Sequence, residues 1–367
     1  MVGITGASGL LGWHIACAIR AAGIDEVRCA SRSEFVDPDR LDRFVRGCDV
    51  VVHLAGVNRG EPILVEEANV AIARDLVAAL ERTGAHPVLI FANSTHRDLD
   101  TPYGRSKRGA ADLFEQWSEH HDAPFVDLVL PNVFGELGRP FANSVVSTFC
   151  YQLAHGTEPT VIEDREIELI HAQDVAAGVL KCLDARRRRQ EVRLDGERMT
   201  VSAVLQRLSD LSNEYRGVAI PGLPTSLDRQ LFNTLRSYRF AVHPRQPVML
   251  NEDARGAFAE LVRRDGAGQV SYSLTHPGVT RGNHFHVSKM ERFVVLEGTA
   301  EIRVRKLFAS EVATVTVDGR QPCAVDMPTL HTHSITNTGS SLLLTLFWVD
   351  DLFDREHPDT FAEPVVL

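Results

Sequence analysis

The sequence of 367 residues lacks any apolar stretch long enough to span a membrane, and its six cysteines include no CxxC pair. A membrane helix needs about 20 consecutive apolar residues, and the N-terminus also lacks the apolar segment of a secretory signal peptide. Cysteines without paired spacing behave as small buried hydrophobic residues in a reducing compartment. We therefore expect a cytoplasmic protein that neither enters a membrane nor depends on disulfides.

Basic residues are outnumbered by acidic ones, 39 against 49, which gives a formal net charge of −10. Binding to a polyanion would need a local basic patch, and the candidate is the arginine run at residues 186–189. No aromatic residue interleaves this run, so it offers no platform on which bases could stack. Cations at a helix end suit the helix dipole, which explains the run without a nucleic acid. Nucleic acid is therefore not an expected partner.

Short apolar runs alternate with amphipathic segments over residues 2–130. Examples are "DVVVHLAG" and "VLIFANS", which are separated by "NVAIARDLVAAL". Continuous apolar strands separated by helices indicate a parallel sheet that is covered on both faces. We predict a doubly wound, Rossmann-like α/β sheet here. The more helical and irregular residues 134–239 are predicted to form a small cap over the carboxyl edge of this sheet.

The composition changes at Pro244 and Pro247, which mark a linker. Beyond them, segments such as "RFVVLEGTAEIRVRK" alternate apolar and polar residues, and glycines punctuate the pattern. Alternation with a period of two predicts an antiparallel β-sandwich or barrel. We therefore divide the chain into an α/β domain at residues 1–242 and an all-β domain at residues 243–367.

A glycine-rich turn, "TGASGLLG", follows the first predicted strand and precedes a helix. Glycines at such a turn allow the backbone to approach a pyrophosphate, which then faces the N-terminus of the helix. The expected cofactor contacts in this loop are Gly6, Ser8, Gly9, Leu10 and Gly12. A glycine-rich turn without a ligand is the simpler interpretation, and it weakens once the following motifs are considered.

The second predicted strand ends in "CASRSE", without the acidic residue that holds the ribose 2′-hydroxyl of NAD. Arg32 follows this strand and could instead pair with the 2′-phosphate of NADP. The alternative is an arginine that is merely solvated at the end of a strand. The sequence therefore favours NADP(H) as the cofactor.

Tyr103 and Lys107 form a YxxxK motif downstream of "ANST". A lysine one turn beyond a tyrosine can lie on the same helix face. Its charge is expected to lower the pKa of the phenol, so that the tyrosine can exchange a proton with a substrate oxygen. The hydroxyl of Ser94, with Thr95 as the alternative, would hold the substrate carbonyl. Ser94, Tyr103 and Lys107 are our predicted catalytic residues.

Taken together, these motifs resemble the extended short-chain dehydrogenases/reductases that epimerise or dehydrate nucleotide sugars. "DVVVHLAG", "NVAIARDLVAAL" and "LPNVFG" match this family, although Val129 and Leu130 stand where many relatives have an arginine before the proline. The resemblance implies a homologous cofactor site and a substrate site beside it. The implied cofactor contacts are Leu54, Ala55, Gly56, Lys107 and Pro131, and the implied substrate contacts are Asn132, Arg139 and Asn143.

The C-terminal part holds a second motif, "GVTRGNHFHVSKMERFVVLEG". His284 and His286 would project from the same face of a strand, because side chains alternate along it, and Glu291 could join them from the return of the hairpin. The spacing from Gly278 to Gly298 is that of the first motif of the cupin family. The motif "MPTLHTHSITN" resembles the second, and it offers His333, with His331 as a competitor and Leu330 in place of the usual glycine.

These residues are expected to bind a divalent transition metal through His284, His286, Glu291 and His333. Three imidazoles and a carboxylate suit zinc, iron, nickel or manganese, and zinc is the metal we expect. The alternative is a cupin that binds a sugar without a metal. The fold class predicted for the whole chain is thus α/β plus all-β, with a C-terminal cupin barrel.

Motif order over the whole chain, including "HLAGVNR", "NSVVSTFCYQLA", "GNHFH" and "SKMERF", resembles the bifunctional capsular polysaccharide enzymes of the CapF type. The resemblance implies a UDP-linked 4-keto-2-acetamido-2,6-dideoxyhexose as substrate. It also implies a UDP-2-acetamido-2,6-dideoxy-L-talose as product, formed by C3 epimerisation in the cupin and NADPH-dependent reduction at C4.

Three points stay open at this stage. The base of the cupin is not identified, and Lys289, Tyr272 and His276 are candidates. The cupin could serve only dimerisation or structure, which would leave a 4-keto-sugar reductase. A sensor that holds NADP without turnover is a third interpretation, but it would not need the tyrosine and the lysine. Because many cupins pair through their strands, we expect a homodimer.

Overall fold

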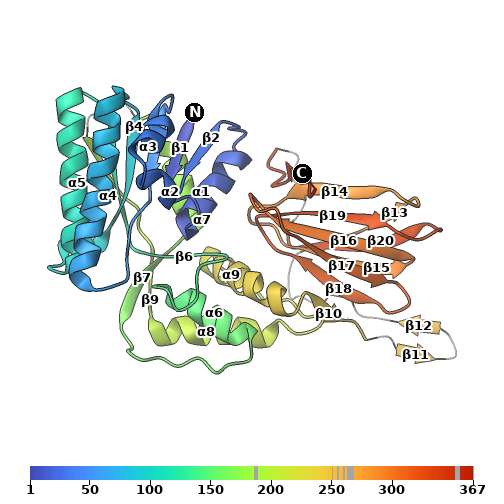
Figure 1. Cartoon of the computed structure of the whole chain (residues 1–367). Coiled ribbons are helices and arrows are strands. Elements are labelled where there is room, and N and C mark those ends of the chain that lie inside the picture. Colours follow the sequence, from blue (N-terminus) through green and yellow to red (C-terminus); the bar gives the residue numbers. More distant parts are fainter. Residues whose placement is uncertain are drawn as a thin grey trace. The chain divides into compact units, whose positions relative to one another are not determined.

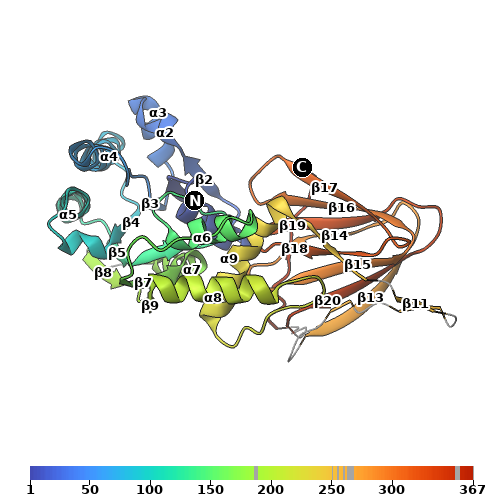
Figure 2. The same ribbon diagram turned by 90° about the horizontal axis from the view of Figure 1, so that it is seen from below.

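The computed structural model describes most of the chain (Figure 1; Figure 2 shows it turned by 90°). The described residues are 1–185, 189–249, 251–253, 256–258, 261–262, 268–351 and 356–366. The chain forms two compact units: one comprises Met1–Thr148 and Glu163–Val201, and the other comprises Phe149–Ile162 and Ser202–Leu367. The expected boundary between residues 242 and 243 lies inside the second unit and remains a prediction.

A six-stranded parallel sheet forms the centre of the first unit, in the order β2-β1-β3-β4-β5-β8. Its strands are β1 (Val2–Thr5), β2 (Val27–Ala30), β3 (Val50–His53), β4 (Val88–Ser94), β5 (Phe125–Leu130) and β8 (Arg189–Arg193). Strands β1, β3 and β5 are buried at every position. Burial of both faces explains why they appear as continuous apolar runs. The predicted Rossmann-like sheet is confirmed.

Helices cover both faces of this sheet (Figure 1). They are α1 (Leu10–Ala21), α2 (Arg32–Phe35), α3 (Pro38–Val45), α4 (Pro62–Thr83), α5 (Pro102–His121) and α7 (Ala172–Cys182), with the 3₁₀ helix η1 (Thr95–Asp98). Ile15 of α1 and Val179 of α7 share one core layer. Leu76 of α4 and Phe114 of α5 share the other. The loops that connect strands to helices therefore gather at the carboxyl edge of the sheet, where ligands bind in such folds.

A small three-stranded sheet continues from the end of β5. It consists of β6 (Asn132–Phe134), β7 (Glu166–His171) and β9 (Glu197–Thr200). β6 runs parallel to β7, and β9 pairs antiparallel with β7. This sheet fixes the direction in which the chain leaves the predicted cofactor site.

The helices expected to form a cap are α6 (Val145–Ala154), α8 (Val201–Glu214) and α9 (Ser226–Val242). A capping box between Thr225 and Asp228 begins α9. Helix α9 contacts the β-rich part of the second unit through an ion pair between Arg229 and Asp350, at 2.9 Å. The Nδ2 of Asn233 also donates to the carbonyl of Ser288, at 3.3 Å. These contacts explain why α9 groups with the C-terminal strands.

Two five-stranded antiparallel sheets form the rest of the second unit. The first has the order β10 (Arg245–Pro247), β18 (Cys323–Met327), β15 (Glu291–Glu297), β20 (Leu343–Val349) and β13 (Gln269–Thr275). The second has the order β17 (Val312–Asp318), β16 (Thr299–Lys306), β19 (His331–Asn337), β14 (Thr280–Phe285) and β21 (Phe361–Ala362). A separate ribbon pairs β11 (Asn251–Asp253) with β12 (Gly256–Phe258). Phe293 and Val325 of the first sheet pack against Ile302 and Ile335 of the second, which confirms the predicted antiparallel architecture.

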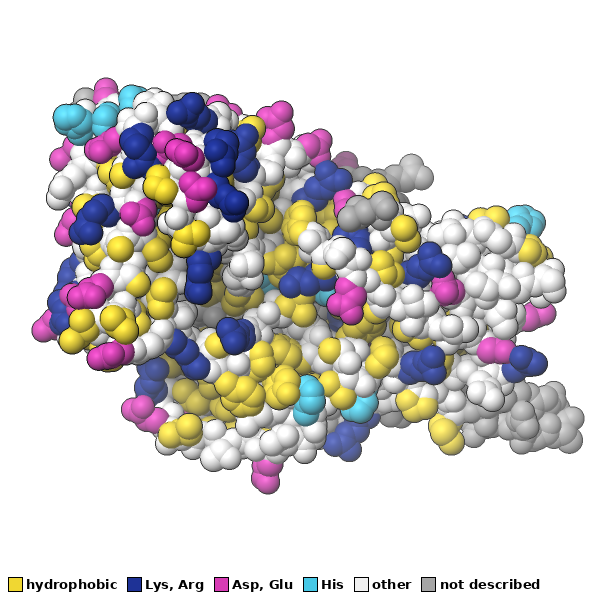
Figure 3. Space-filling view, viewed as in Figure 1, with side chains coloured by type: hydrophobic (Ala, Val, Ile, Leu, Met, Phe, Trp, Pro, Cys, Tyr) yellow, Lys and Arg dark blue, Asp and Glu magenta, His cyan; other side chains and the backbone are white. Residues whose placement is uncertain are grey.

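Within the described part of the chain, no helix combines the length and the apolar character needed to cross a membrane. Acidic and basic side chains are intermixed over α4 and α5 on the face shown in Figure 3. Ion pairs account for part of this mixing: Arg105 of α5 lies 2.9 Å from Glu66 of α4. Of the arginine run at 186–189, residues 186–188 lie outside the described residues, and Arg189 pairs with Glu115.

Candidate functional site

The glycine-rich loop between β1 and α1 is built for close approach of backbone atoms. Gly6 has a φ of +67°, and a Cβ added there would lie 2.9 Å from the amide nitrogen of Ala55. A Cβ on Gly12 would lie 2.4 Å from the carbonyl oxygen of Gly6. Gly9 precedes α1 without a side-chain cap, and the first turn of α1 has no acidic residue. The N-terminal amides of α1 can therefore bind an anion such as pyrophosphate.

The end of β3 lies beside this loop because β3 pairs in parallel with β1, and one hydroxyl extends this contact beyond the strands. The Oγ1 of Thr5 accepts hydrogen bonds from the amides of Leu54 and Ala55, each at 3.1 Å. Farther along, the Oδ1 of Asn69 accepts from the amide of Val57 at 2.6 Å. The predicted contacts at residues 54–56 are thus placed next to the glycine-rich loop, as a dinucleotide site requires.

Ser94, Tyr103 and Lys107 lie together at the end of β4 and the start of α5. Ser94 is the last residue of β4, and its hydroxyl forms a hydrogen bond with the Tyr103 phenol. The Nζ of Lys107 donates to the carbonyl of Ala92 at 2.8 Å and lies 5.9 Å from the centre of the Tyr103 ring. The three side chains can therefore act on one substrate oxygen and one cofactor.

Burial controls the pKa values of this group. It lowers the pKa of the Lys107 ammonium to about 8, although the Asp127 carboxylate acts in the opposite direction. It raises the pKa of the Tyr103 phenol, which the hydrogen bond with Ser94 partly offsets. The expected lowering of the tyrosine pKa is therefore wrong for the protein without ligands. The lysine charge lies too far from the phenol, at the Ala92 carbonyl, to outweigh the loss of hydration.

The remaining predicted residues of the first unit follow strands β2 and β5: Arg32 begins α2, Asn132 begins β6, and Arg139 and Asn143 lie in the loop after β6. Arg32 is exposed and begins α2, directly after the Ser31 that follows β2. The Nδ2 of Asn132 donates to the carbonyl of Glu168 at 3.1 Å, whereas Arg139 is exposed. The Oδ1 of Asn143 accepts from Arg59 at 2.7 Å. Pro131 is buried at the end of β5. Asn132 and Asn143 thus already bond to protein groups, and Arg139 presents a cation to solvent.

A buried ionisable cluster beneath these loops was not predicted from the sequence. Glu136 is fully buried, and its Oε2 lies 3.1 Å from the Nε2 of His171 and 3.7 Å from the Nε2 of His14. Burial alone would raise the pKa of Glu136, but the charge and hydrogen bonding of His171 and the charge of His14 outweigh it and lower this pKa to about 2. The cluster joins α1, β7 and the loop that carries Arg139.

We expect Glu136→Gln to lower the free energy of unfolding by roughly 3 kcal/mol at pH 7, because it removes the carboxylate whose interactions with His171 and His14 lower its pKa in the folded state. The pKa of Glu136 is lowered on folding, from 4.5 to about 2. Its contribution to stability is therefore present above pH 4.5 and is lost as the pH falls towards 2. Thermal unfolding followed from pH 7 to pH 3 should show the two proteins converging below pH 4.5.

The control for this prediction is Glu119→Gln, which changes an exposed glutamate of α5. The thermal unfolding of this variant should match that of the parent protein at every pH. A gap between Glu136→Gln and the parent that stays constant with pH would show that the carboxylate charge does not stabilise the cluster.

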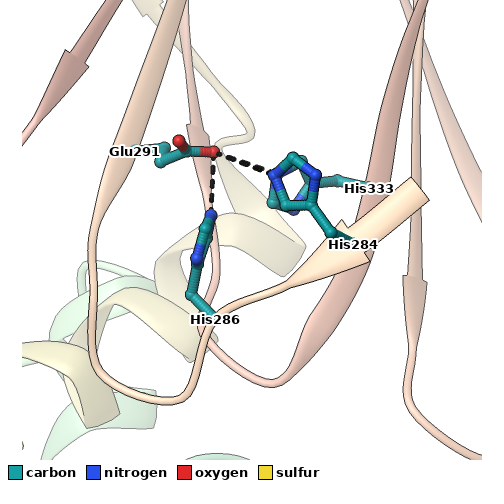
Figure 4. Close-up of side chains that lie close together, drawn as sticks. All are labelled: His284, His286, Glu291 and His333. Carbon is teal, nitrogen blue, oxygen red and sulfur yellow. Dashed lines mark hydrogen bonds and ion pairs between the residues drawn. The ribbon is translucent and has the colours of Figure 1, made fainter. Parts of the chain in front are cut away.

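The second candidate site brings together the four predicted metal ligands (Figure 4). Their ligating atoms lie within 4.8 Å of one another. The Oε2 of Glu291 lies 3.0 Å from the Nε2 of His286, 3.0 Å from that of His333 and 3.8 Å from that of His284. His331 instead bonds to the carbonyl of Thr329 at 2.8 Å and does not belong to this group.

The strands explain this geometry. A register shift between Gly282 and His284 interrupts the pairing of β14 with β19, and Gly282 and Asn283 have φ angles of +101° and +59°. Such a bulge re-aims the following side chains, here His284. His333 lies directly opposite His284 on β19. Glu291 begins β15 in the other sheet, so both sheets contribute ligands. The hairpin expected from the sequence is therefore wrong, because the turn after β14 crosses to the opposite sheet instead of pairing β14 with β15.

The electrostatics of the group fit a divalent cation. Burial would raise the pKa of Glu291, but the three imidazoles, two of them 3.0 Å from its Oε2, hold this pKa far below its usual range. Burial lowers the pKa of His333, which favours the neutral imidazole that a metal needs. Three imidazole nitrogens converge on one carboxylate oxygen. A cation placed among them would be bound by these four atoms in place of their contacts with one another. The donor set suits zinc and related ions.

The three candidates for the base of the C-terminal domain do not join this cluster. The Nζ of Lys289 donates to the carbonyl of Pro358 at 2.7 Å. The Tyr272 side chain is 71 % exposed on β13, and His276 is also exposed. None of these positions alone identifies a base.

Comparisons with known proteins agree with both halves of this description. Residues 2–193 match the NAD dependent epimerase/dehydratase family, and residues 251–361 match the polysaccharide biosynthesis C-terminal domain. A UDP-2-acetamido-2,6-beta-L-arabino-hexul-4-ose reductase from Pseudomonas aeruginosa is 31 % identical over 365 residues, which cover 98 % of this chain and 97 % of the relative. The sequence similarity thus extends over both units.

Solved structures give the same result. The capsular polysaccharide assembling protein CapF from Staphylococcus aureus is similar with a TM-score of 0.63 and 28 % identity, covering 99 % of each chain. The RMD protein from Pseudomonas aeruginosa, solved with NADPH, shares the fold with a TM-score of 0.55 and 18 % identity, over 65 % of this chain and 97 % of that one. The resemblance noted in the sequence is confirmed, and NAD(P) is the cofactor class. The chain belongs to the CapF-type family of sugar-nucleotide enzymes in polysaccharide biosynthesis, with an N-terminal domain of the NAD dependent epimerase/dehydratase family.

Proposed function

We propose that this protein epimerises a UDP-4-keto-2-acetamido-2,6-dideoxyhexose at C3 in its C-terminal domain and then reduces C4 with NADPH in its N-terminal domain. The observation that carries the proposal is the presence of two different reactive clusters in one chain. One joins Ser94, Tyr103 and Lys107. The other joins three histidines to Glu291. The substrate named for the Pseudomonas reductase, a 4-ulose, supports the same choice of sugar.

The chemistry of the sugar sets the order of the two steps. A ketone at C4 makes the neighbouring C3 hydrogen acidic, so a base can remove this proton and return it on the other face. Reduction at C4 removes the ketone, and the resulting alcohol has no comparably acidic hydrogen at C3. Epimerisation must therefore come first, and the reduction then traps the epimer.

The residues of the first cluster can perform the reduction. NADPH, when bound, supplies the hydride that forms the new C4–H bond. Tyr103 gives its phenolic proton to the C4 oxygen, so that a carbonyl becomes an alcohol. Ser94 donates a hydrogen bond to the same oxygen and keeps it at the tyrosine. Asn132, Arg139 and Asn143 are the side chains that we propose bind the nucleotide sugar.

The second cluster can support the epimerisation. A zinc ion, when bound, would supply positive charge for the oxygen of an enolate. His284, His286, Glu291 and His333 would hold it. The bulge in β14 and the start of β15 fix the directions of these side chains. A separate group must move the C3 proton, and no described residue is assigned to that task.

The experiment that tests this function uses the purified protein with the UDP-4-keto sugar. With NADPH, we expect oxidation of one NADPH per sugar and an NMR spectrum of a product inverted at C3. In D₂O without NADPH, we expect deuterium to enter at C3. Reduction without inversion would leave only a ketoreductase, and a sugar that is neither exchanged nor reduced would overturn the proposal.

We expect Arg32→Ala to raise the KM for NADPH roughly 10- to 100-fold, because a charge-assisted pair with the 2′-phosphate is lost. The KM for NADH should stay the same, since NADH has no 2′-phosphate. Steady-state rates with each cofactor measure the effect. Arg74→Ala, at an exposed position of α4, serves as the control for a lost surface charge. An equal change with both cofactors would exclude a contact of Arg32 with the 2′-phosphate.

One observation favours the alternative in which the C-terminal domain serves dimerisation. Strand β13 is the last strand of its sheet. Its side chains Val270, Tyr272 and Leu274 are 58 %, 71 % and 51 % exposed. Such an apolar edge can pair with a second copy of the chain. A homodimer is also compatible with a catalytic C-terminal domain, so hydrogen exchange at C3 of the sugar distinguishes the two functions. A dimer that exchanges no C3 hydrogen would have a C-terminal domain that serves only dimerisation.

A further inference from the structure

The turn between β14 and β15 decides how two of the four metal ligands are placed. β14 ends at Phe285 and β15 begins at Glu291, so His286 lies on the turn itself and Glu291 lies at its end. The amide of Met290 donates to the Oδ1 of Asp350 at 2.8 Å, which fixes the second end of the turn. Residues 287–289, between these anchors, need other partners.

The carboxylate of Asp359, near the C-terminus, supplies the hydrogen-bond partners for the turn at residues 287–289. The Oδ1 of Asp359 accepts from the amide of Val287 at 2.9 Å. Its Oδ2 accepts from the amides of Ser288 and Lys289 at 3.0 and 2.8 Å, and from the Ser288 hydroxyl at 3.0 Å. Three consecutive amides that converge on one carboxylate define the path of the turn. Hydrogen bonds to an ionised acceptor are also stronger than those to a neutral one.

Asp359 also contacts a metal ligand directly through its backbone. Its carbonyl oxygen lies 2.5 Å from the Nδ1 of His286. Because a carbonyl only accepts hydrogen bonds, Nδ1 must carry the proton, which leaves the lone pair of Nε2 for a metal. This Nε2 is the atom that faces Glu291, at 3.0 Å.

The segment around Asp359 is itself held along the strand that carries His284. β21 pairs with β14 so that Ala362 lies opposite His284 and Phe361 lies opposite Phe285. The rings of Phe285 and Phe361 stack with centroids 5.2 Å apart. Asp359 has a φ of +39°, in the left-handed region that non-glycine residues rarely adopt. The surrounding contacts therefore hold Asp359 in a specific and uncommon conformation.

We propose that Asp359 is a positioning residue of the metal centre. Its carboxylate shapes the turn at 287–289, and its carbonyl sets the tautomer and the direction of His286. This inference rests on the proposed metal-binding function of the four-residue cluster. The C-terminal segment thereby has a role at the metal centre although it supplies none of the four ligands.

The test compares the full-length parent with Asp359→Asn, which keeps the size of the side chain but points an amide group at backbone donors. Zn²⁺ affinity is measured by competition with a chromophoric chelator, and Co²⁺ absorption reports the ligand geometry. We expect Asp359→Asn to bind Zn²⁺ about 10- to 100-fold more weakly, the usual effect of disturbing an outer partner of a ligand, because loss of the carboxylate releases the turn and moves the carbonyl that holds His286. The Co²⁺ spectrum should change, because the turn that carries His286 loses its anchor.

The matched control is Asp318→Asn. The Oδ1 of Asp318 also accepts a backbone amide, that of Arg320 at 2.9 Å. It lies at the other end of the sheet, where Asp318 pairs with Thr299, whereas His333 pairs with Val304. This variant should bind Zn²⁺ and Co²⁺ as the parent does. An equal loss in both variants would overturn the proposal, because it would indicate general destabilisation.

A second variant keeps the test decisive if Asp359→Asn does not fold. Ser288→Ala removes one of the bonds to Asp359 and should weaken Zn²⁺ binding in the same direction, to a smaller extent. Unchanged Zn²⁺ affinity in either folded variant would overturn the role of Asp359. A parent that binds no Zn²⁺ would instead overturn the proposed metal function, so the two failures are distinguishable.

Discussion

Replacing Tyr103 with phenylalanine is expected to lower kcat for the reduction of the keto sugar by about 10²- to 10⁴-fold, the usual contribution of a positioned proton donor. The ring would still fill its half-buried place beside Lys107, so the cofactor site should keep its shape. The substitution removes the phenolic hydroxyl, and with it the proton that the C4 oxygen of the sugar receives. NADPH oxidation under saturating sugar measures the change, and fluorescence titration with NADPH should give an unchanged Kd.

Two further measurements make this result specific. Tyr151→Phe removes a phenol on α6 and should reduce the sugar at the parent's rate. Deuterium should still enter C3 in Tyr103→Phe, because that step is assigned to the other domain. A variant that reduces at the parent's rate would show that Tyr103 does not donate the proton. Loss of C3 exchange as well would contradict the assignment of the two steps to separate sites.

The pKa of Lys107 adds a pH dependence to the same reaction. Burial lowers this pKa to about 8, so the ammonium is charged below pH 8 and increasingly neutral above it. If the charge assists proton transfer from Tyr103, the reduction rate of the parent should fall above pH 8. The raised pKa of the phenol keeps Tyr103 protonated over this range, as a proton donor requires.

Most of the fold could be predicted because its signals are local. Strands β3 and β5 are buried on both faces and appear as apolar runs, whereas the strands of the sandwich alternate. β8 was not predicted: its sequence, RQEVR, is polar because it is the edge strand of the sheet and alternates between half-buried and exposed positions. The periodicity of α9 indicates a helix but not its partner, so its ion pair with Asp350 became visible only in the structure.

The same distinction between local sequence signals and contacts of distant residues applies to the candidate sites. YxxxK and HxHx₄E place their side chains within one helical turn or on two strands joined by a short turn, so their spacing keeps them close together. The Glu136 carbonyl and His14 are 122 positions apart, and Asp359 and His286 are 73 apart. No local pattern marks such pairs. The direction of the Tyr103 pKa shift could not be predicted either, because it depends on burial and on where the Lys107 ammonium bonds.

Replacing His286 with alanine should remove the C3 epimerisation while leaving the reductase domain intact. His286 is buried, and its Nε2 lies 3.0 Å from Glu291. Since losing an outer partner of a ligand already weakens metal binding 10- to 100-fold, losing the ligand itself should weaken Zn²⁺ binding by more than about 100-fold. Deuterium incorporation at C3, followed by NMR without NADPH, measures the loss of the reaction.

The control is His155→Ala, which removes an exposed imidazole of the second unit without touching the cluster. It should bind Zn²⁺ and exchange C3 hydrogen at the parent's rate. For His286→Ala, circular dichroism and NADPH binding should match the parent, which separates the loss of a ligand from unfolding. If a folded His286→Ala protein without metal exchanges C3 hydrogen normally, the metal has no part in epimerisation. The proton transfer would then depend on protein side chains alone, and the four-residue cluster would have to be explained as a structural site.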